Sequence, residues 1–546
     1  MEYAFKLVSS LEKVFFDRPD AMTGYTHGSM LKNEIHAFQL VGWFDDPDAC
    51  MQNCYLQIDS PLSPCIRVYK IGYVPGILPA IEVNCDNDYL TKTPGLFPDP
   101  LHEIKNGKLE LIARQARAFW VSVEPAGEMM GIYPIVMKIT DEDGKQVAEL
   151  TYTVEIIPAE LPKLSIKNTG WFHGDCIAVL HHTQIMSEAY FDLLDKYLQV
   201  YAKFGHNMIL TPVFTPPIDT AVGAERPTNQ LVDVRVEQGV YSFEFSKLKR
   251  WIALCRKHGI EWFEISHLFT QWGAKHTPKI MATVDGTYRK IFGWETDALS
   301  PEYATFLNAF LPALTSFLTE EGVLEKCYFH VSDEPLPEHD AQYGAARQIL
   351  LKHIDEMQLI DALGHYSIYE KGLVKTPIVC NDHIHTFIEK GVTNLWTYYC
   401  MGQRKEVANR FMAMPAYRNR ILGWQIYKNR ILGFLHWGFN FWFLEKSRGV
   451  LNPYMDTCAG GCFPAGDPFV VYPLDPDGAV VCSTRLYVFH ESMQDLRALE
   501  LLKSLTDRNT VEQLLNDIDG FKKYPRSNDY LIHLRECVNR LIRENI

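Results

Sequence analysis

Two adjacent carboxylates, Asp333 and Glu334, are the residues whose types and spacing best suit catalysis. They follow residues 328–331, an aromatic and β-branched run typical of a strand, and Pro335 interrupts that pattern. In parallel α/β proteins, sites are built at the carboxyl ends of strands. Neighbours in a regular strand point to opposite faces, so both acids can serve one cavity only where the strand ends or bulges. The alternative is a solvated Asp-Glu pair that caps a helix beginning near Glu338.

An adjacent acid pair fits one form of glycoside hydrolysis. Most glycosidases place two carboxylates on opposite sides of the scissile bond, ~5–5.5 Å apart in retaining enzymes. The strand expected at residues 393–400 has no acid that could be the distant partner. In the substrate-assisted variant, the 2-acetamido oxygen of the sugar attacks its own anomeric carbon. Glu334 would protonate the leaving oxygen and later activate water, while Asp333 would hold the acetamido N–H.

Aromatic and polar side chains gather at the ends of the other expected strands, and Trp171 is one of them. Taken singly, each ring or histidine is more often part of the core. Taken together, stacking rings and hydrogen-bonding groups at a barrel mouth suit a pocket for a neutral polyol. The predicted substrate-binding residues are His173, Asp175, Asn207, His267, Gln271, Trp272, Trp396, Tyr398, Trp437 and Asn440.

The elements that would position these residues alternate between strands and helices over residues 163–445. Alternation of this kind implies right-handed crossovers and a parallel sheet, and eight expected strands favour a closed (β/α)8 TIM-type barrel of the α/β class. Amphipathic helices are predicted from Ser187 to Gly205, over 246–259 and over 300–322. The eight expected strands are 169–175, 206–212, 260–266, 327–333, 361–369, 376–385, 393–400 and 431–442.

The two ends of the chain have a different pattern from the middle. Alternating apolar positions and the turn Asp-Glu-Asp-Gly at 141–144 predict an N-terminal β-sandwich over residues 1–162. Such a sandwich could bind carbohydrate, but a packing role or a homodimer contact is more common. Residues 446–546 are expected to form a β-hairpin and helices packed on the barrel.

Charge and cysteine usage restrict the partners. There are 53 Lys and Arg against 67 Asp and Glu, and the net charge of −14 argues against nucleic acid or an anionic membrane. We see no signal peptide and no span long enough to cross a bilayer. Thirteen cysteines fit reduced thiols of a cytoplasmic protein. The pairs Cys458/Cys462 and Cys50/Cys54 lack a second pair at ligand spacing, so we predict neither metal nor cofactor.

Several pieces of the chain between Gly170 and about Leu502 match a known family. They are WFHGDC, NMILTPVFTPPIDT, SHLFTQWGAKH, HVSDEP, LWTYY, ILGW, GFLHWGFNFW and GDPFVVYP. On these pieces the chain resembles the bacterial barrel proteins related to glycoside hydrolase family 123, the β-N-acetylgalactosaminidases. The resemblance implies a retaining exo-β-N-acetylgalactosaminidase with substrate-assisted catalysis, in which Asp333 and Glu334 take the two acid roles. In two places this chain departs from the relatives, with Cys400-Met-Gly-Gln403 in place of Cys-x-x-Pro and with Phe439 in place of a second tryptophan.

Two other functions remain open at this point. One is an exo-hexosaminidase that acts on β-N-acetylglucosaminides, because only the orientation of one hydroxyl separates the two sugars. The other is a non-catalytic carbohydrate-binding barrel protein, against which the presence of both acids argues. In each case the partner is a glycan or glycoside that contains an N-acetylhexosamine.

Overall fold

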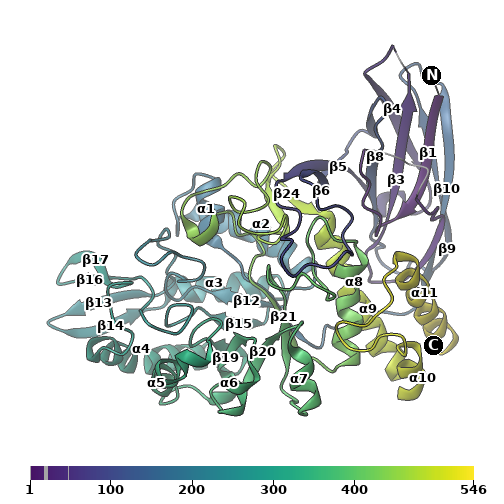
Figure 1. Cartoon of the computed structure of the whole chain (residues 1–546). Helices are drawn as coiled ribbons and strands as arrows, with labels where there is room; N and C mark the ends of the chain where they lie inside the picture. Colours follow the sequence, from purple (N-terminus) through teal and green to yellow (C-terminus); the bar gives the residue numbers. More distant parts are fainter. Residues whose placement is uncertain (1, 17–21, 47) are drawn as a thin grey trace.

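The computed structural model describes residues 2–16, 22–46 and 48–546. Two β-sheets pack face to face at the N-terminal side of the molecule and share one apolar core (Figure 1). Side chains alternate between this core and the outer face, as at Ile135, Met137 and Ile139 of β9. The first sheet runs β1 (Glu2–Ser9), β3 (His36–Asp45), β8 (Arg117–Val123), β5 (Ile66–Gly76), β6 (Gly95–Glu103), β24 (Val480–Ser483) and β23 (Val471–Leu474), and the second runs β2 (His27–Leu31), β10 (Gln146–Ile157), β9 (Gly131–Thr140), β4 (Met51–Asp59) and β7 (Lys108–Ile112).

Eight parallel strands form a near-closed barrel in the middle of the chain, which confirms the predicted mixed α/β architecture. The sheet begins and ends at β18 and β19, and a single bridge between Phe329 and Leu359 joins these edges. In sheet order the strands are β18 (Cys327–Phe329), β15 (Trp262–Ile265), β12 (Met208–Thr211), β11 (Lys167–Gly170), β22 (Gly433–His436), β21 (Trp396–Tyr398), β20 (Thr376–Cys380) and β19 (Ile360–Leu363).

A helix follows each barrel strand, and serine caps begin two of these helices, of which the cap at Ser187 was predicted. The Ser187 hydroxyl accepts from the N–H of Tyr190, and the Ser300 hydroxyl accepts from the N–H of Tyr303. The helices are α1 (Gly174–Leu180), α2 (Glu188–Lys203), α3 (Ser246–Lys257), α4 (Pro301–Glu320), α5 (Asp340–Leu350), α6 (Tyr366–Glu370), α7 (Ile384–Glu389), α8 (Tyr417–Lys428), α9 (Thr484–Leu505), α10 (Arg508–Leu514) and α11 (Asn528–Glu544).

Several local predictions were wrong, and one small sheet was missed. The first barrel strand ends at Gly170 rather than continuing to Asp175, and α1 begins at Gly174. Residues 366–369 belong to α6 rather than to a strand. A small four-stranded sheet lies in the β12–α3 and β15–α4 connections and was not expected. It contains β13 (Asp233–Glu237), β14 (Val240–Glu244), β16 (Ile280–Val284) and β17 (Thr287–Phe292), which lie at the left of Figure 1.

The C-terminal segment joins the barrel to the sandwich. The predicted hairpin is present as β23 and β24, but Cys482 of β24 pairs with Leu101 of β6, so the hairpin extends the N-terminal sheet. Behind this edge, Arg485 of α9 donates two hydrogen bonds to buried Asp99, at 2.8 and 2.9 Å. Both charges are buried and each neutralises the other, so this ion pair ties α9 to the N-terminal sheet.

Across the described residues, we find no helix with both the length and the apolar character needed to cross a bilayer. Each of the thirteen cysteines is a free thiol.

Candidate active site

A cavity of about 140 Å³ opens at the carboxyl ends of the barrel strands. Since parallel strands deliver their following residues to the same end of a barrel, segments distant in sequence meet here. Aromatic rings form much of the wall, and three carboxyl groups face inward. The lining residues are Trp171, Ile218, Asp219, Gln271, Trp272, Asp333, Glu334, Ala362, Tyr398, Cys400, Met401, Leu435, Trp437 and Phe463.

The neighbouring acids Asp333 and Glu334 both line this cavity because the chain has left the strand before reaching them. Strand β18 ends at Phe329, and Glu334 has a φ of 45°, in the left-handed region that non-glycine residues rarely adopt. The N–H of Trp272 donates a 2.9 Å hydrogen bond to the carbonyl of Asp333 and so fixes this turn. Backbone strain of this kind costs ~1–3 kcal/mol and is concentrated at functional sites.

The surroundings of the acid pair raise the pKa of both carboxyl groups. Burial raises the pKa of Glu334 and the charge of Asp382 adds to the effect, while a 2.6 Å hydrogen bond from the Tyr398 hydroxyl to Glu334 Oε1 opposes it. Burial, followed by the charge of Glu334, raises the pKa of Asp333 well above its ordinary value. Two neighbouring carboxyl groups do not both ionise readily, so the first of the two to ionise makes it harder to ionise the second.

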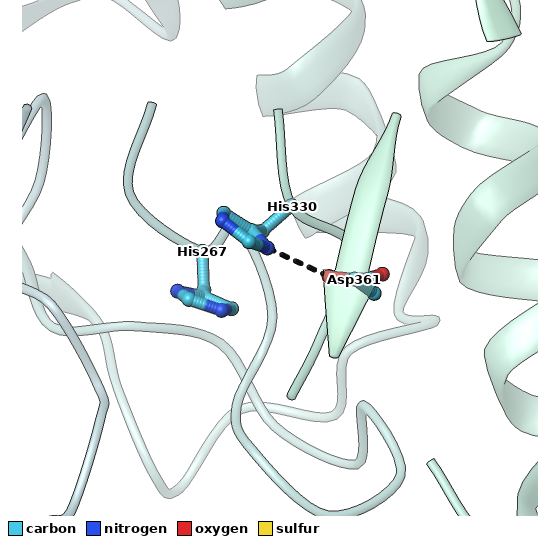
Figure 2. Close-up of side chains that lie close together, drawn as sticks. All are labelled: His267, His330 and Asp361. Atoms are coloured by element: carbon cyan, nitrogen blue, oxygen red, sulfur yellow. Dashed lines mark hydrogen bonds and ion pairs between the residues drawn. The ribbon is translucent and has the colours of Figure 1, made fainter. Parts of the chain in front are cut away.

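A buried imidazole, His330, connects two acids from neighbouring strands beside this pair. Its Nε2 lies 2.6 Å from Glu264 Oε1. On the other side, its Nδ1 lies 2.9 Å from Asp361 Oδ1, the contact drawn as a dashed line in Figure 2. Glu264 also accepts from Trp171 Nε1 at 2.6 Å, and Asp361 accepts from the Tyr343 hydroxyl. Burial alone would lower the pKa of His330, but its two carboxylate partners outweigh burial and raise the pKa to about 10.

His267 stacks on His330, with ring centroids 4.1 Å apart and ring planes 17° from parallel (Figure 2). Burial, and then the charge of His330, keep the pKa of His267 well below its ordinary value, so its ring is neutral. Although His267, His330 and Asp361 lie close together, they do not suit a metal ion. Both nitrogens of His330 already face carboxylates, and stacked rings cannot direct their lone pairs at one point.

Another group of metal-ligand types lies in the turn after β20. Cys380, Asp382 and His383 bring a thiol, a carboxylate and an imidazole within 4.8 Å of one another. His383 Nδ1 is 3.0 Å from Asp382 Oδ1 and 3.3 Å from Cys380 Sγ, and Gln403 donates to the same carboxylate oxygen. These groups therefore satisfy one another within the turn.

Some of the predicted substrate-binding residues reach the cavity, namely Gln271, Trp272, Tyr398 and Trp437, and Trp171 joins them. Gln271 Oε1 accepts from the N–H of Asp219 at 2.7 Å, and Trp437 Nε1 donates to Asp467 at 3.0 Å. Trp272 is 42% exposed and lies at the rim. These contacts fix the aromatic walls before any ligand binds.

Three other predicted residues, His173, Asp175 and Asn440, form a separate buried cluster. Arg226 donates to both carboxylate oxygens of Asp175 at 2.8 and 2.9 Å and lies 3.1 Å from His173 Nδ1. The side chain of Asn440 hydrogen-bonds the N–H and the carbonyl of His173. The expectation fails for these residues because the strand ends at Gly170, and the segment after it packs against the residues that follow β22.

Three more predicted residues, Asn207, Trp396 and His267, also lie away from the cavity. Asn207 precedes β12, at the opposite end of the barrel, where its side chain hydrogen-bonds the N–H of Asn168 and the carbonyl of Ile166. Trp396 begins β21 and is buried in the barrel core, and His267 is buried beside His330. Residue type alone did not show at which end of a strand each side chain lies.

Asp219 is the main cavity residue that the sequence did not suggest. Its carboxylate accepts a 3.0 Å hydrogen bond from the N–H of Lys446, and burial raises its pKa to about 6. It lies in the long connection after β12, just beyond Pro216 and Pro217, so its place after a strand was the one available signal. The other unpredicted lining residues are Ile218, Ala362, Cys400, Met401, Leu435 and Phe463.

A larger cavity, of about 550 Å³, lies beside α8, α9 and α10. Ser165 and Leu432 line it and precede β11 and β22, so it lies at the amino ends of the strands. Its acids are already engaged, because Glu500 accepts from Ser165, and Glu512 pairs with Arg508 at 2.6 Å. Since none of its acids forms an adjacent pair, we assign the chemistry to the smaller cavity.

Comparison with known families agrees with this location. The family model described as glycoside hydrolase 123, catalytic domain, matches residues 171–502, well over half of the chain. The chain belongs to glycoside hydrolase family 123. The matched region begins with the cavity residue Trp171 and includes the acid pair. Membership of the family supports glycosidase activity.

Among solved structures, the family 123 glycoside hydrolase from Clostridium perfringens has a TM-score of 0.76 at 16% identity, covering 99% of this chain and 98% of that one. This likeness extends the shared fold beyond the matched catalytic domain. The β-glucuronidase of Bifidobacterium dentium aligns at a TM-score of 0.31 and 9% identity, covering 90% of this chain and 66% of that one. The β-glucuronidase of Parabacteroides merdae aligns at a TM-score of 0.30 and 10% identity, covering 90% of this chain and 53% of that one. These scores are too low to support an argument. No curated protein matches the sequence.

The two positions where the sequence is expected to depart from the family pattern, Cys400–Gln403 and Phe439, fall in different places. Cys400 and Met401 line the cavity, and Gln403 accepts a 2.9 Å hydrogen bond from the N–H of Cys400. Phe439 is fully buried and packs edge-on against Tyr201, away from the cavity. Only the first departure therefore changes the wall that a sugar would meet.

Proposed function

We propose that this family 123 glycosidase is a retaining exo-β-N-acetylgalactosaminidase that uses the 2-acetamido group of its substrate as the nucleophile. The observation that carries the proposal is the acid pair Asp333 and Glu334, which lines one aromatic-walled cavity and in which burial raises the pKa of both carboxyl groups. Adjacent carboxyl groups on one segment cannot flank a scissile bond from opposite sides, so they suit one acid and one group that supports an internal nucleophile.

Glu334 is the general acid. Its raised pKa keeps a proton available for the glycosidic oxygen. Since Tyr398 donates to Oε1, Oε2 is the oxygen that carries this proton and delivers it to the leaving group. After the leaving group departs, Glu334 as carboxylate takes a proton from the water that attacks the anomeric carbon.

Asp333 supports the nucleophile. As the acetamido oxygen forms its bond to the anomeric carbon, positive charge develops on the acetamido nitrogen. The carboxylate of Asp333 accepts the N–H and stabilises this charge. Water then opens the oxazoline-like intermediate from the face that the leaving group occupied, so two inversions give retention.

The size and walls of the cavity support action at the end of a glycan. At about 140 Å³ it is much smaller than the roughly 300–1,000 Å³ clefts that bury larger ligands, so it suits one sugar ring. Rings from Trp171, Trp437 and Phe463 supply apolar faces of the kind on which sugars stack. A β-N-acetylglucosaminidase or another exo-hexosaminidase would use the same acids, and a non-catalytic carbohydrate-binding barrel would use the same walls.

A panel of aryl β-glycosides tests the proposal on the purified protein. We expect hydrolysis of the N-acetyl-β-galactosaminide to be fastest, with no loss after EDTA treatment because no step requires a metal ion. Faster hydrolysis of the N-acetyl-β-glucosaminide would change the sugar but keep the mechanism. A folded protein that cleaves no acetamido sugar would refute the catalytic assignment.

The nucleophile is tested separately, because Asp219 provides a third carboxyl group in the cavity. We expect a thiazoline analogue of the intermediate to inhibit strongly, since a catalytic site binds such species tightly. If Asp219 were the nucleophile, a 2-fluoro sugar would instead leave a glycosyl ester on the protein. Mass spectrometry after each treatment distinguishes the two routes.

A further inference from the structure

Buried charged side chains lie beside the acid pair. Two of them, Glu264 and Asp361, are negative, and His330 is positive. Glu264 and Asp361 both raise the pKa of Asp333, whereas the positive charge of His330 lowers it. His330 is also linked to the pair through the backbone, because the N–H groups of Val331 and Ser332 donate to Asp361 Oδ2 at 3.2 and 3.4 Å.

We propose that His330 is a positioning residue for the reaction. Its imidazolium, bonded on both sides to Glu264 and Asp361, offsets their charges and so makes it easier to ionise Asp333. This inference rests on the proposed function, which gives Asp333 to the acetamido N–H and Glu334 to the leaving oxygen.

The hydrogen-bond directions require the imidazolium. Trp171 donates to Glu264, and the Tyr343 hydroxyl donates to Asp361, as do two backbone N–H groups. Donors in this number stabilise the ionised form of a carboxylate and oppose the burial that raises the pKa of Asp361. A neutral imidazole has one N–H, so one of its contacts, at 2.6 or 2.9 Å, would place a lone pair against an ionised carboxylate oxygen. With both carboxylates ionised, only the doubly protonated ring fits both contacts.

The surroundings of His330 show what its charge does. The titratable groups around it are Glu264 on β15, His267 after β15, Asp361 on β19, Tyr343 on α5, and the acid pair after β18. With a neutral ring, the two carboxylates would leave two uncompensated negative charges near Asp333, which would make Asp333 still harder to ionise. A protonated Asp333 could not stabilise the charged acetamido nitrogen.

Replacing the two stacked rings separately tests this role. His330→Gln removes the charge, whereas His267→Phe removes a neutral ring from the same stack and serves as the matched control. On an aryl N-acetyl-β-galactosaminide, we expect His330→Gln to move the acidic limb of the kcat/KM profile up by about one pH unit, which is about a tenfold loss on that limb. His267→Phe should leave the limb where it is. Equal losses in both variants at every pH, with unmoved limbs, would overturn the proposal.

A second measurement does not depend on whether the variants fold. Neutron diffraction from the wild-type protein should show deuterium on both ring nitrogens of His330, and deuterium on only one would overturn the inference. Failure of the proposed function would appear first, as an inactive wild type. Failure of this inference alone would appear as an active wild type with a neutral His330, or with an unmoved limb in His330→Gln.

Discussion

Two acidic clusters lie at the carboxyl end of the barrel, a buried one around Asp175 and a half-buried one at Asp333 and Glu334. Arg226 bonds both oxygens of Asp175, so that carboxylate is satisfied inside the protein. Asp333 and Glu334 instead face a cavity, and the charge of Glu334 raises the pKa of Asp333. The contrast indicates that an acid whose hydrogen bonds are all made within the protein has a structural role. An acid that faces a cavity is available to a substrate.

The largest effect should come from Glu334→Gln. General acid assistance is worth ~10²–10⁴-fold, so kcat/KM for substrates with poor leaving groups should fall by this factor. Activated aryl glycosides, which need little protonation, should lose much less. Glu338→Gln, an exposed change in the same loop, is the matched control. Equal losses on both kinds of substrate would contradict the acid role.

Arg226→Met should damage stability rather than chemistry. Removing one partner of a buried ion pair leaves an uncompensated charge, and typically costs about 3–5 kcal/mol. Urea unfolding measures the loss. The double variant Arg226→Met/Asp175→Leu should recover most of it, because neither charge is then left buried alone. An unchanged urea midpoint in Arg226→Met would contradict the structural role given to the Asp175 cluster.

Asp219→Asn should have a smaller effect, on binding. If Asp219 accepts one hydroxyl of the sugar, KM should rise about tenfold, equivalent to about 1.4 kcal/mol, with kcat little changed. Steady-state kinetics on the best aryl glycoside separates the two constants. A collapse of kcat would instead mark Asp219 as the nucleophile.

The smallest effect should be a gain in stability from Asp333→Asn. The folded-state pKa of Asp333 lies above its unfolded value, so ionisation costs the folded state free energy once the pH rises above about 4. The Asn variant avoids this cost and should be about 1 kcal/mol more stable at pH 7, with the gain disappearing near pH 4. Thermal unfolding at both pH values, with Glu338→Gln as control, tests it. A loss of stability at pH 7 would show that Asp333 is satisfied like Asp175.

Local patterns were enough to predict the repeated strand and helix order. Ser187 and Ser300 are helix caps because a serine hydroxyl satisfies a free backbone N–H, whatever surrounds it. The segment 171–175 was predicted less well, because an apolar run reads the same in a strand and in the loop that follows it. The strand predicted over 169–175 ends at Gly170 and the strand predicted over 431–442 ends at His436, so His173, Asp175 and Asn440 do not line the cavity.

By itself, the sequence determined the alternation that makes the barrel, the family motifs, and the presence of Asp333 and Glu334 just after a strand. These features depend on neighbours along the chain, which the sequence contains. Only the tertiary structure decided that Asp219 lines the cavity while Asn207 does not, and that His330 lies between Glu264 and Asp361. Those facts depend on which residues from distant strands meet, and burial and charge act through such contacts rather than through sequence spacing.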